Sequence, residues 1–528
     1  MGVYLNPGNQ GFQSALRSQI YVDKTELLVY TNKVMDSEQR YLCVSRPRRF
    51  GKSMAAEMLV AYYDRSCDSR KLFEKLSVAK SEDFEKHLNQ YSVIHIDVTS
   101  FLHRQKVPKI AMEMFPLSVI GELKESFPKC VKEEDSSLPY VLEKINNMTG
   151  EQFIIVIDEW DAIFREDKLD AEAQEIYIDL LRGLFKDASS KRFLKLAYMT
   201  GILPVKKYGT QSALNNFDEF TMINPSALSK YVGFTEEEVQ SLCNRYEMDF
   251  SEVKRWYDGY CFRREKHVYN PNSVVKAMLR EEYDSYWSQT ETYEVLKDYI
   301  CMNFDGLKDD IISMLGGGRC KVNFQTFQND MASFHGKEDI LTLLIHLGYL
   351  AYDADTQEVF IPNEEIKMEF KNAVKAADWN QVVQAIMASD ALLKATWQKE
   401  EETVAAGIAA VHEANTSILS YHDENSLSCV ISLAYYNAVN EYIMIREMPT
   451  GKGYADIVFL PRRHSDKPAM IIELKWNQSA EGAITQIKDR HYIQVLEEYK
   501  GKLLLVGINY NKETKKYQCC IEEMIVTE

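Results

Sequence analysis

The sequence predicts an α/β protein in three parts: a parallel sheet with its helices, a helical lid and connector, and a second α/β domain. Three observations carry this prediction. Apolar runs of strand length alternate with helical patterns up to residue 224, helical patterns dominate residues 225–398, and mixed patterns return over residues 399–528. The length of 528 residues also suits about three domains at roughly 100 to 200 residues each. We therefore expect domain boundaries after residues 224 and 398.

The first part contains apolar runs with the length of buried strands. They cover residues 41–44, 92–98, 153–157 and 193–200. Because helical patterns separate them, they predict a doubly wound parallel sheet. In such a sheet ligands bind at the carboxyl ends of the strands, so residues that directly follow these runs are candidates for a binding site.

The later parts have their own element patterns. Thr235 is followed by three glutamates, which predicts a capped helix at the start of the lid. The last part predicts a helix over residues 426–442 and another from about 480. Strands are expected at residues 455–459, 470–475 and 502–508. This order describes a compact αββαβ unit.

Composition narrows the classes of function. The net charge of −17 argues against a protein that coats nucleic acid through its overall charge, although a local basic groove stays open. The ten cysteines show no metal-ligand spacing, so we expect reduced thiols and no structural zinc. No apolar stretch approaches about 18 residues and the amino terminus does not resemble a signal peptide. We expect a cytoplasmic protein without a membrane partner.

A phosphate-binding loop is predicted between the first strand and the helix that follows it. Gly51, Lys52 and Ser53 end the pattern G-x-x-x-x-G-K-S, in which backbone N–H groups wrap phosphates, the lysine reaches the β and γ phosphates and the serine binds Mg2+. The general pattern has its first glycine where this chain has Arg46. We expect ATP to be bound by the whole loop, which consists of Arg46, Pro47, Arg48, Arg49, Phe50, Gly51, Lys52 and Ser53.

A second motif supports the nucleotide site. Asp158 and Glu159 end the apolar run at residues 153–157, and this arrangement predicts that Asp158 holds Mg2+ and that Glu159 orients the attacking water. Thr200 follows the next strand and is a candidate γ-phosphate contact, with a plain turn as the alternative. No residue can be assigned as an arginine finger. If a neighbour supplies one, the protein must form a homo-oligomer to be active, and the sequence leaves this open.

Several segments resemble the bacterial AAA-ATPase-like family. They read YVDKT at residues 21–25, SRPRRFGKS at 45–53, GFTEEE at 233–238, WYDGY at 256–260 and YNPNS at 269–273. An arginine-bearing loop without the first glycine is typical of that family, which accounts for Arg46. The resemblance covers about the first half of the chain and implies ATP binding.

Three charged residues of the last part are expected on one face of its sheet. Glu473 and Lys475 alternate on a strand, and Asp456 on a neighbouring strand can join them. The two acids could hold Mg2+ or Mn2+, while the lysine could position a water or stabilise charge on a phosphodiester. A surface cross-strand salt bridge is the alternative explanation.

The segments around these residues resemble the PD-(D/E)XK nuclease superfamily. They are residues 451–456, 472–475, 480–483, 486–487 and 506–508. The resemblance implies a restriction-endonuclease-like fold with Asp456, Glu473 and Lys475 at its centre. It also implies that Gln486 faces the site from a helix and that Glu424 is an additional acid.

Two functions follow from these motifs. The leading hypothesis is an ATPase whose nucleotide state controls a metal-dependent nuclease acting on DNA or RNA. The alternative is an ATP-switched regulatory or binding module with a catalytically silent nuclease-fold domain. Alanine at Glu473 separates them, because only the first hypothesis predicts a cleavage activity that this substitution removes while ATP hydrolysis remains.

Overall fold

A computed structural model gives the fold over most of the chain. It describes residues 2–526 except 106, 167–169, 206, 209–210, 213, 288–292, 303, 316–317, 325–326, 328–333, 378–379, 415–430, 432–433, 436–437, 439–440, 451–452, 462–466 and 490–500.

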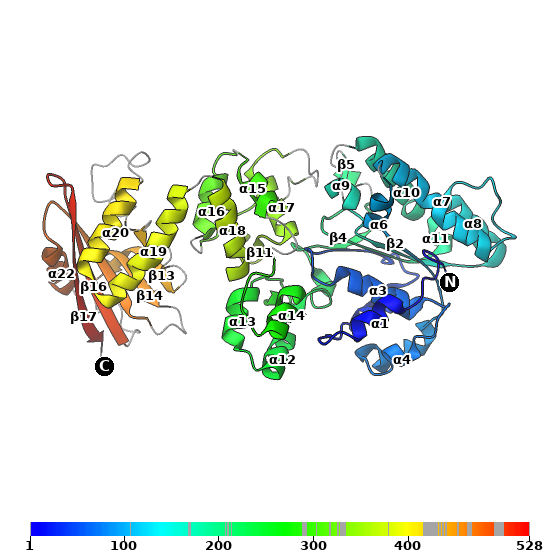
Figure 1. Cartoon of the computed structure of the whole chain (residues 1–528), viewed down its shortest axis with the longest axis horizontal. Helices are drawn as coiled ribbons and strands as arrows, with labels where there is room; N and C mark the ends of the chain where they lie inside the picture. Colours follow the sequence, from blue (N-terminus) through cyan, green and yellow to red (C-terminus); the bar gives the residue numbers. More distant parts are fainter. Residues whose placement is uncertain are drawn as a thin grey trace. The chain divides into compact units, whose positions relative to one another are not determined.

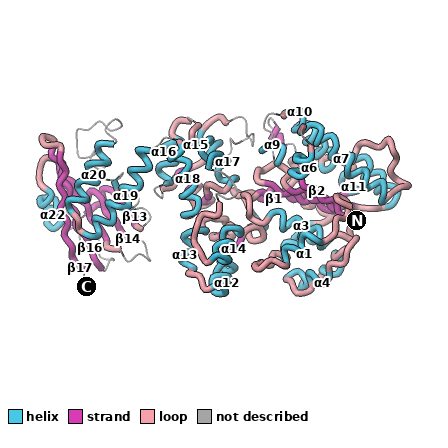
Figure 2. Tube along the Cα trace, viewed as in Figure 1, coloured by secondary structure: helices cyan, strands magenta, loops and turns pink. Residues whose placement is uncertain are grey.

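The chain divides into two compact units. The first contains Met1–Val295, Met302–Leu307 and Cys320–Glu369, and the second contains Leu296–Cys301, Lys308–Arg319 and Phe370–Glu528. Each unit has its own five-stranded sheet, drawn in magenta in Figure 2. The predicted domain boundaries after residues 224 and 398 stay a prediction.

A parallel sheet organises the first unit. Its order is β2-β3-β4-β1-β7, and every neighbouring pair is parallel. The strands are β1 (Tyr41–Ser45), β2 (Ser92–Asp97), β3 (Phe153–Asp158), β4 (Leu194–Gly201) and β7 (Asp218–Phe220). The predicted parallel sheet is therefore confirmed, while the short edge strand β7 was not expected. Because β4 lies between β1 and β3, the carboxyl ends of these three strands meet at one edge.

Helices cover both faces of this sheet (Figure 1). On one face lies α3 (Lys52–Tyr63), which directly follows the phosphate-binding loop. On the other lie α7 (Pro108–Ser126), α8 (Leu138–Thr149) and α10 (Ala171–Phe185), whose apolar residues share a buried cluster with β3. The shorter elements of this region are α1 (Gln10–Leu16), α2 (Glu26–Val34), α4 (Arg70–Phe73), η1 (Ser77–Lys80), α5 (Phe84–His87), α6 (Val98–Arg104), α9 (Ala162–Glu166), α11 (Ser190–Phe193), β5 (Lys207–Tyr208), β6 (Gln211–Ser212) and η2 (Ser226–Leu228).

The region predicted as the lid begins as expected. The Thr235 side chain accepts a hydrogen bond from the Glu238 N–H, and the Glu238 side chain accepts one from the Thr235 N–H, which caps α12. The elements are β8 (Phe234–Thr235), α12 (Glu236–Tyr246), α13 (Phe250–Tyr257), β9 (Val268–Tyr269) and α14 (Pro271–Arg280). The short strands β8 and β9 form an antiparallel pair although α12 and α13 lie between them in the sequence, a pairing that the helical pattern did not indicate.

The connector mixes helices with a small sheet of order β10-β12-β11. Its elements are α15 (Tyr293–Ile300), α16 (Leu307–Leu315), β10 (Cys320–Lys321), α17 (Lys337–Leu347), β11 (Ala351–Asp353), β12 (Glu358–Phe360), α18 (Glu364–Ala376) and α19 (Asn380–Gln398). Among all residues that the structure describes, no helix combines the length and the apolar content needed to cross a bilayer.

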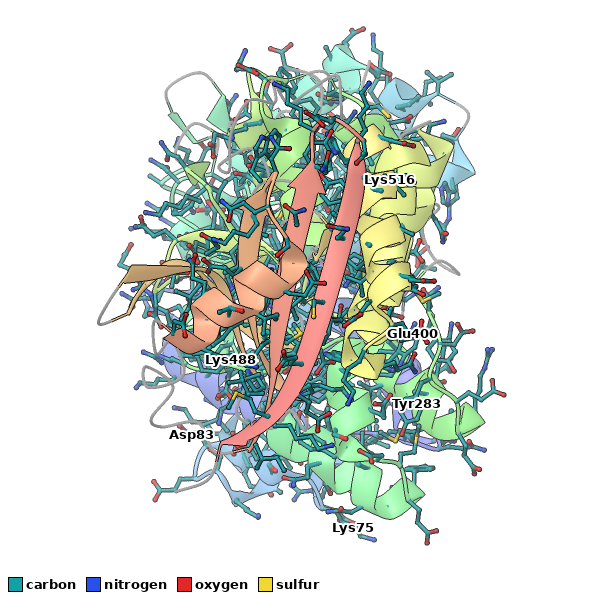
Figure 3. All side chains as sticks on the ribbon, turned by 90° about the vertical axis from the view of Figure 1, so that its left-hand side faces the viewer. Lys75, Asp83, Tyr283, Glu400, Lys488 and Lys516 are labelled. Atoms are coloured by element: carbon teal, nitrogen blue, oxygen red, sulfur yellow. The ribbon has the colours of Figure 1, made fainter. Side chains whose placement is uncertain are left out.

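A mixed sheet organises the second unit. Its strands are β13 (Tyr442–Thr450), β14 (Gly453–Pro461), β15 (Ala469–Trp476), β16 (Gly501–Asn511) and β17 (Lys516–Val526), in that order. Only β15 and β16 run parallel, and α22 (Ala480–Asp489) lies between them in the sequence. Figure 3 shows α22, marked by Lys488, lying across the strands.

Two apolar clusters hold this sheet. One joins it to α19 and α20 (Glu401–Ala414), and the other joins it to α22. The three predicted strands lie within β14, β15 and β16, whereas β13 and β17 were not predicted. Tyr442, expected at the end of a helix, begins β13 instead, and most of residues 426–441 lie outside the described part of the chain.

Candidate nucleotide and nuclease-like sites

The loop between β1 and α3 has the backbone geometry of a phosphate site. Gly51 is the N-cap of α3, with φ of 92°. A Cβ at this position would meet no atom within 4 Å, so the backbone lies open on that side. Because the first N–H groups of a helix have no intrahelical acceptor, the start of α3 is suited to bind an anion.

Lys52 is the buried cation of this loop. Its side chain is 3% exposed, and its Nζ donates to the Pro47 carbonyl oxygen at 3.0 Å. The same atom lies 3.7 Å from Glu159 Oε1. Burial lowers the pKa of Lys52, while Glu159 and nearby aspartates act in the opposite direction. A cation with so little water around it gains strongly from an anionic ligand.

Asp158 is held by two hydroxyl groups at the end of β3. Thr200 donates to its Oδ1 at 2.8 Å, and the Ser53 side chain also hydrogen-bonds the carboxyl. Burial, assisted by Glu159, raises the pKa of Asp158, and the hydrogen bonds and Lys52 oppose that change. The sheet order explains this arrangement. Asp158 ends β3, Thr200 lies near the end of β4, and Ser53 follows β1, and these three strands are neighbours in the sheet.

Glu159 has a left-handed backbone, with φ of 50°, which is uncommon outside glycine. Its Oε2 accepts a hydrogen bond from Nη2 of Arg165 in α9. Arg165 also donates through Nε to Asp161 Oδ2 at 3.0 Å. Sequence reasoning missed Arg165 and Asp161, although their spacing of four residues on a helical turn is a known signal for an ion pair.

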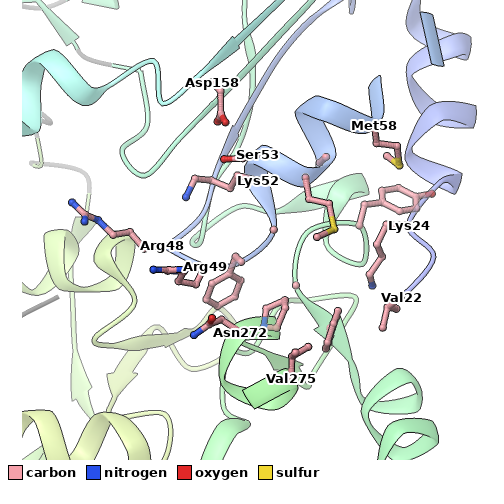
Figure 4. Close-up of a pocket in the computed structure, with 18 of the residues that line it drawn as sticks. Val22, Lys24, Arg48, Arg49, Lys52, Ser53, Met58, Asp158, Asn272 and Val275 are labelled. Carbon is pink, nitrogen blue, oxygen red and sulfur yellow. The ribbon is translucent and has the colours of Figure 1, made fainter. Parts of the chain in front are cut away.

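These residues line a cavity of about 650 Å³. Cavities of this size accommodate small-molecule ligands, for which roughly 300–1,000 Å³ is typical. Figure 4 shows Lys52, Ser53 and Asp158 together at one end of the cavity, with Arg48 and Arg49 beside the loop. The predicted residues that line it are Arg48, Arg49, Phe50, Gly51, Lys52, Ser53, Asp158 and Glu159.

The other end of the cavity is largely apolar and comes from segments that sequence reasoning did not place in the site. Figure 4 shows Val22, Lys24 and Val275 there. Lys24 donates to the Lys230 carbonyl oxygen at 2.7 Å and pairs with Glu238 at 2.6 Å, which ties the segment before α2 to the lid. The further apolar lining residues are Phe12, Ile20, Met54, Met58 and Phe234.

Three predicted residues do not line the cavity. Thr200 donates a hydrogen bond to Asp158, and the Pro47 carbonyl oxygen accepts one from Lys52. Arg46 is fully buried, and its Nη1 donates to the carbonyl oxygens of Ser45 and Phe220, each at 2.9 Å. Its guanidinium lies 5.0 Å from the centre of the Phe262 ring. Arg46 thus connects the loop to β7.

The carboxyl-terminal residues come together on the second sheet. Glu473 and Lys475 lie on β15, and Gln486 lies on α22. Lys475 Nζ is 2.7 Å from Gln486 Oε1 and 3.4 Å from Glu473 Oε1, and Gln486 Nε2 also donates to Glu473 Oε1. Glu473 is 2% exposed and Lys475 is 9% exposed. This is a buried group rather than a surface salt bridge.

Asp456 approaches the same group from β14. The register pairs Ile457 with Ile472, so Asp456 and Glu473 are the next residues on the two strands. The Asp456 Oδ2 accepts a hydrogen bond from the Leu474 N–H at 2.7 Å. Glu424, the additional acid implied by the resemblance, lies outside the described residues.

Comparisons with known proteins give two family matches, one curated relative and several solved structures. A protein of Azotobacter chroococcum mcd 1, described as "Uncharacterized protein in vnfD 5'region", is 25% identical over 285 residues, or 53% of this chain. The match spans about half of that relative, 52% of its length.

Several solved structures also match at low identity. The Aeropyrum pernix ORC2 protein in ADPNP-ADP complexes is 9% identical, with a TM-score of 0.29 over 70% of this chain and 98% of its own. Cdc6p from Pyrobaculum aerophilum is 12% identical, with a TM-score of 0.23 over 67% of this chain and 93% of its own.

The family matches fall on the two parts of the chain whose motifs are described above. Residues 8–210 match the family described as "Predicted AAA-ATPase", and residues 422–519 match the PD-(D/E)XK nuclease superfamily. The chain therefore carries an AAA-ATPase-like segment followed by a PD-(D/E)XK nuclease superfamily segment, as its sequence motifs predict.

Proposed function

We propose that the first unit binds ATP with Mg2+ and hydrolyses it, and that its nucleotide state controls a metal-dependent nuclease-like site acting on DNA or RNA. One observation carries the first half of this proposal. The cavity of about 650 Å³ is lined by a glycine-led helix start, a buried lysine and two acids at the end of a strand. This donor and acceptor set fits a magnesium-bound triphosphate.

Each residue has a part in the proposed ATP complex. The N–H groups at the start of α3 and Lys52 bind the phosphates, and Ser53 and Asp158 hold Mg2+. The hydrogen bond of the Ser53 side chain to the Asp158 carboxyl supports this pairing. The metal ion neutralises charge on the phosphate oxygens. The apolar end of the cavity, which includes Val22 and Val275, receives the nucleoside.

Hydrolysis then needs a positioned water. Its oxygen attacks the γ-phosphorus, the bond to the bridging oxygen of ADP breaks, and Glu159 receives a proton from that water. Glu159 is suited to this task because it lines the cavity and its carboxylate lies 3.7 Å from the lysine that binds phosphates in such loops.

The second half of the proposal concerns the group around Glu473. Asp456 and Glu473 hold Mg2+ or Mn2+, Lys475 stabilises charge on the phosphodiester, and Gln486 orients Glu473 and Lys475 through its amide. Support comes from the burial of Glu473 and Lys475 and from their shared contacts with Gln486.

One observation favours the alternative, an ATP-switched module with a silent nuclease fold. Oε1 of Glu473 already accepts hydrogen bonds from both Lys475 and Gln486. A metal ion that binds Glu473 through Oε1 must exchange at least one of these contacts for a coordination bond. A site that cannot make this exchange would recognise its partner without cutting it.

The nucleotide half is tested by titrating Mg2+ and ATP into the wild type and Lys52→Ala and by measuring phosphate release. We expect Lys52→Ala to lower hydrolysis at least about 100-fold, because the phosphates lose their buried cation. The matched control is Lys33→Ala, which removes an exposed lysine of α2. Equal hydrolysis in Lys52→Ala and Lys33→Ala would overturn the assignment of the site.

A further inference from the structure

Glu159 is in contact with two cations. Its Oε1 lies 3.7 Å from Lys52 Nζ, and its Oε2 accepts a hydrogen bond from Arg165. All three side chains line the cavity. The two oxygens of the proposed catalytic carboxylate are thus engaged by different partners.

Arg165 is held independently of Glu159. Its Nε donates to Asp161 Oδ2 at 3.0 Å, and its side chain is 7% exposed. Asp161 is fully buried, and its Oδ2 also accepts the N–H groups of Ile202 at 3.1 Å and Leu203 at 2.8 Å. Because these backbone groups directly follow β4, Arg165 is anchored to the end of the sheet.

ATP binding should affect the two cations differently. Lys52 is the phosphate-binding lysine of the loop, so a triphosphate draws it from Glu159 Oε1. Arg165 has Asp161 as a second anchor and can remain on Oε2. One oxygen of Glu159 is then presented to water while the other stays fixed, which is the orientation that water activation requires.

We infer that Arg165 is the positioning residue for Glu159 in ATP hydrolysis. It acts through Glu159, and its own anchor is Asp161. This inference rests on the proposed ATPase function and adds to it a residue outside both sequence motifs. It predicts that loss of Arg165 lowers turnover and leaves nucleotide affinity nearly unchanged.

A double-mutant cycle tests the inference in the full-length chain. We would measure kcat and KM for ATP, and Kd for a non-hydrolysable ATP analogue, in the wild type, Arg165→Ala, Glu159→Gln and the double variant. We expect Arg165→Ala to lower kcat about 100-fold, as a misplaced catalytic group does. In the Glu159→Gln background the same change should lower kcat less than about 3-fold, because coupled residues are non-additive. The analogue Kd should change less than about 3-fold in every variant.

Two results would overturn the inference. Equal losses in both backgrounds would mean that Arg165 does not act through Glu159. A loss of analogue affinity above about 10-fold would place Arg165 on the phosphates or in the fold. A wild type that hydrolyses no ATP would instead reject the proposed function itself, and the inference with it.

Arg165→Lys provides a second variant if Arg165→Ala fails to fold, since it keeps a cation beside the buried Asp161. We expect about a 10-fold loss of kcat that again disappears in the Glu159→Gln background. Arg182→Ala is the matched control, because it removes an arginine that is 40% exposed and paired with Asp179 on the surface of α10. It should leave kcat and KM unchanged.

Discussion

The carboxylates of the nucleotide site and of the carboxyl-terminal site have different hydrogen-bond partners. At the nucleotide site, Asp158 is held by the neutral hydroxyls of Ser53 and Thr200, and a cavity of about 650 Å³ adjoins it. At the carboxyl-terminal site, Glu473 is hydrogen-bonded by the side chains of Lys475 and Gln486 themselves. The first site uses hydroxyls that can remain in place beside a metal ion. The second uses Lys475 and Gln486, which are themselves part of its proposed chemistry.

Because of this difference, we expect ligand binding at the first site to need less rearrangement of side chains than metal binding at the second. In the proposed ATP complex Lys52 leaves Glu159 for the phosphates, so substitutions at the first site should act on affinity and turnover. A metal ion that binds through Oε1 of Glu473 at the second site must replace hydrogen bonds within a buried group. Substitutions there should therefore act on metal binding and on cleavage.

The largest effect is expected for Glu473→Ala. Removing this carboxylate takes away a proposed metal ligand, so nucleic-acid cleavage should fall about 1,000-fold while ATP hydrolysis is retained. Glu522→Ala is the matched control, because Glu522 is a glutamate of β17 that pairs with Lys488 near the surface. Gel-based cleavage and phosphate release provide the two readouts. Cleavage that survives Glu473→Ala would show that this site does not cut.

A smaller effect is expected for Gln486→Ala, which removes the amide that contacts both Lys475 and Glu473. Loss of such an orienting group typically costs about 10- to 100-fold in metal affinity or activity. When the cleavage rate is measured at increasing Mn2+ concentration, Gln486→Ala should therefore need more Mn2+ than the wild type to reach half of its maximal rate. An unchanged Mn2+ requirement would indicate that the observed contacts are not part of the active arrangement.

At the nucleotide site, Thr200→Val sharpens the role of the hydroxyls. The change keeps the shape of the side chain and removes the donor to Asp158, which should weaken Mg2+-dependent ATP binding about 10-fold. Thr31→Val is the control, because Thr31 also carries a buried hydroxyl, 2.6 Å from the Tyr63 hydroxyl and outside the cavity lining. Isothermal titration with MgATP measures both. Equal losses in the two variants would contradict a specific role for Thr200.

The smallest effect concerns the stability of the nucleotide-free protein. Burial raises the pKa of Asp158 above its ordinary value of 3.8, so above that pH the folded state holds more protons than the unfolded state. The free energy of unfolding therefore falls as pH rises from the unfolded to the folded pKa, by about 1.4 kcal/mol for each pH unit that separates the two. Asp158→Asn should be more stable than the wild type at neutral pH. The difference in free energy of unfolding between the two should shrink toward pH 4.

Urea unfolding at several pH values checks this prediction. The neutral asparagine has no ionisation to lose, so its contribution does not change with pH. A gap that widens as pH falls would mean that the fold stabilises the charged form of Asp158, against the direction given by its burial.

The sequence predicted the parts of the fold that depend on strand pattern. Apolar runs ending in Asp158 and Thr200, and a loop ending in Ser53, converge because parallel strands end at the same edge of a sheet. β17 was missed although Tyr517, Cys519 and Ile521 alternate with polar residues or Cys520. The cysteines weaken this period-two signal.

The remaining site residues depend on contacts that spacing does not specify. Arg165 reaches Glu159 because the chain turns at a left-handed residue directly after β3. Arg46 was expected at the phosphates, and the structure connects it to β7 through the Phe220 carbonyl. Lid residues such as Val275 enter the cavity from a part of the sequence far from the loop, which local patterns do not reveal.

Nucleic-acid cleavage measured with and without ATP tests the central claim most directly. Plasmid, linear and single-stranded DNA and RNA would be incubated with Mg2+ or Mn2+ and with the wild type, Lys52→Ala or Glu473→Ala. The account predicts that the wild type cleaves at least one substrate, that ATP changes its rate, that Lys52→Ala loses this response to ATP, and that Glu473→Ala loses cleavage. ATP hydrolysis without cleavage of any substrate would contradict the account and favour the regulatory module.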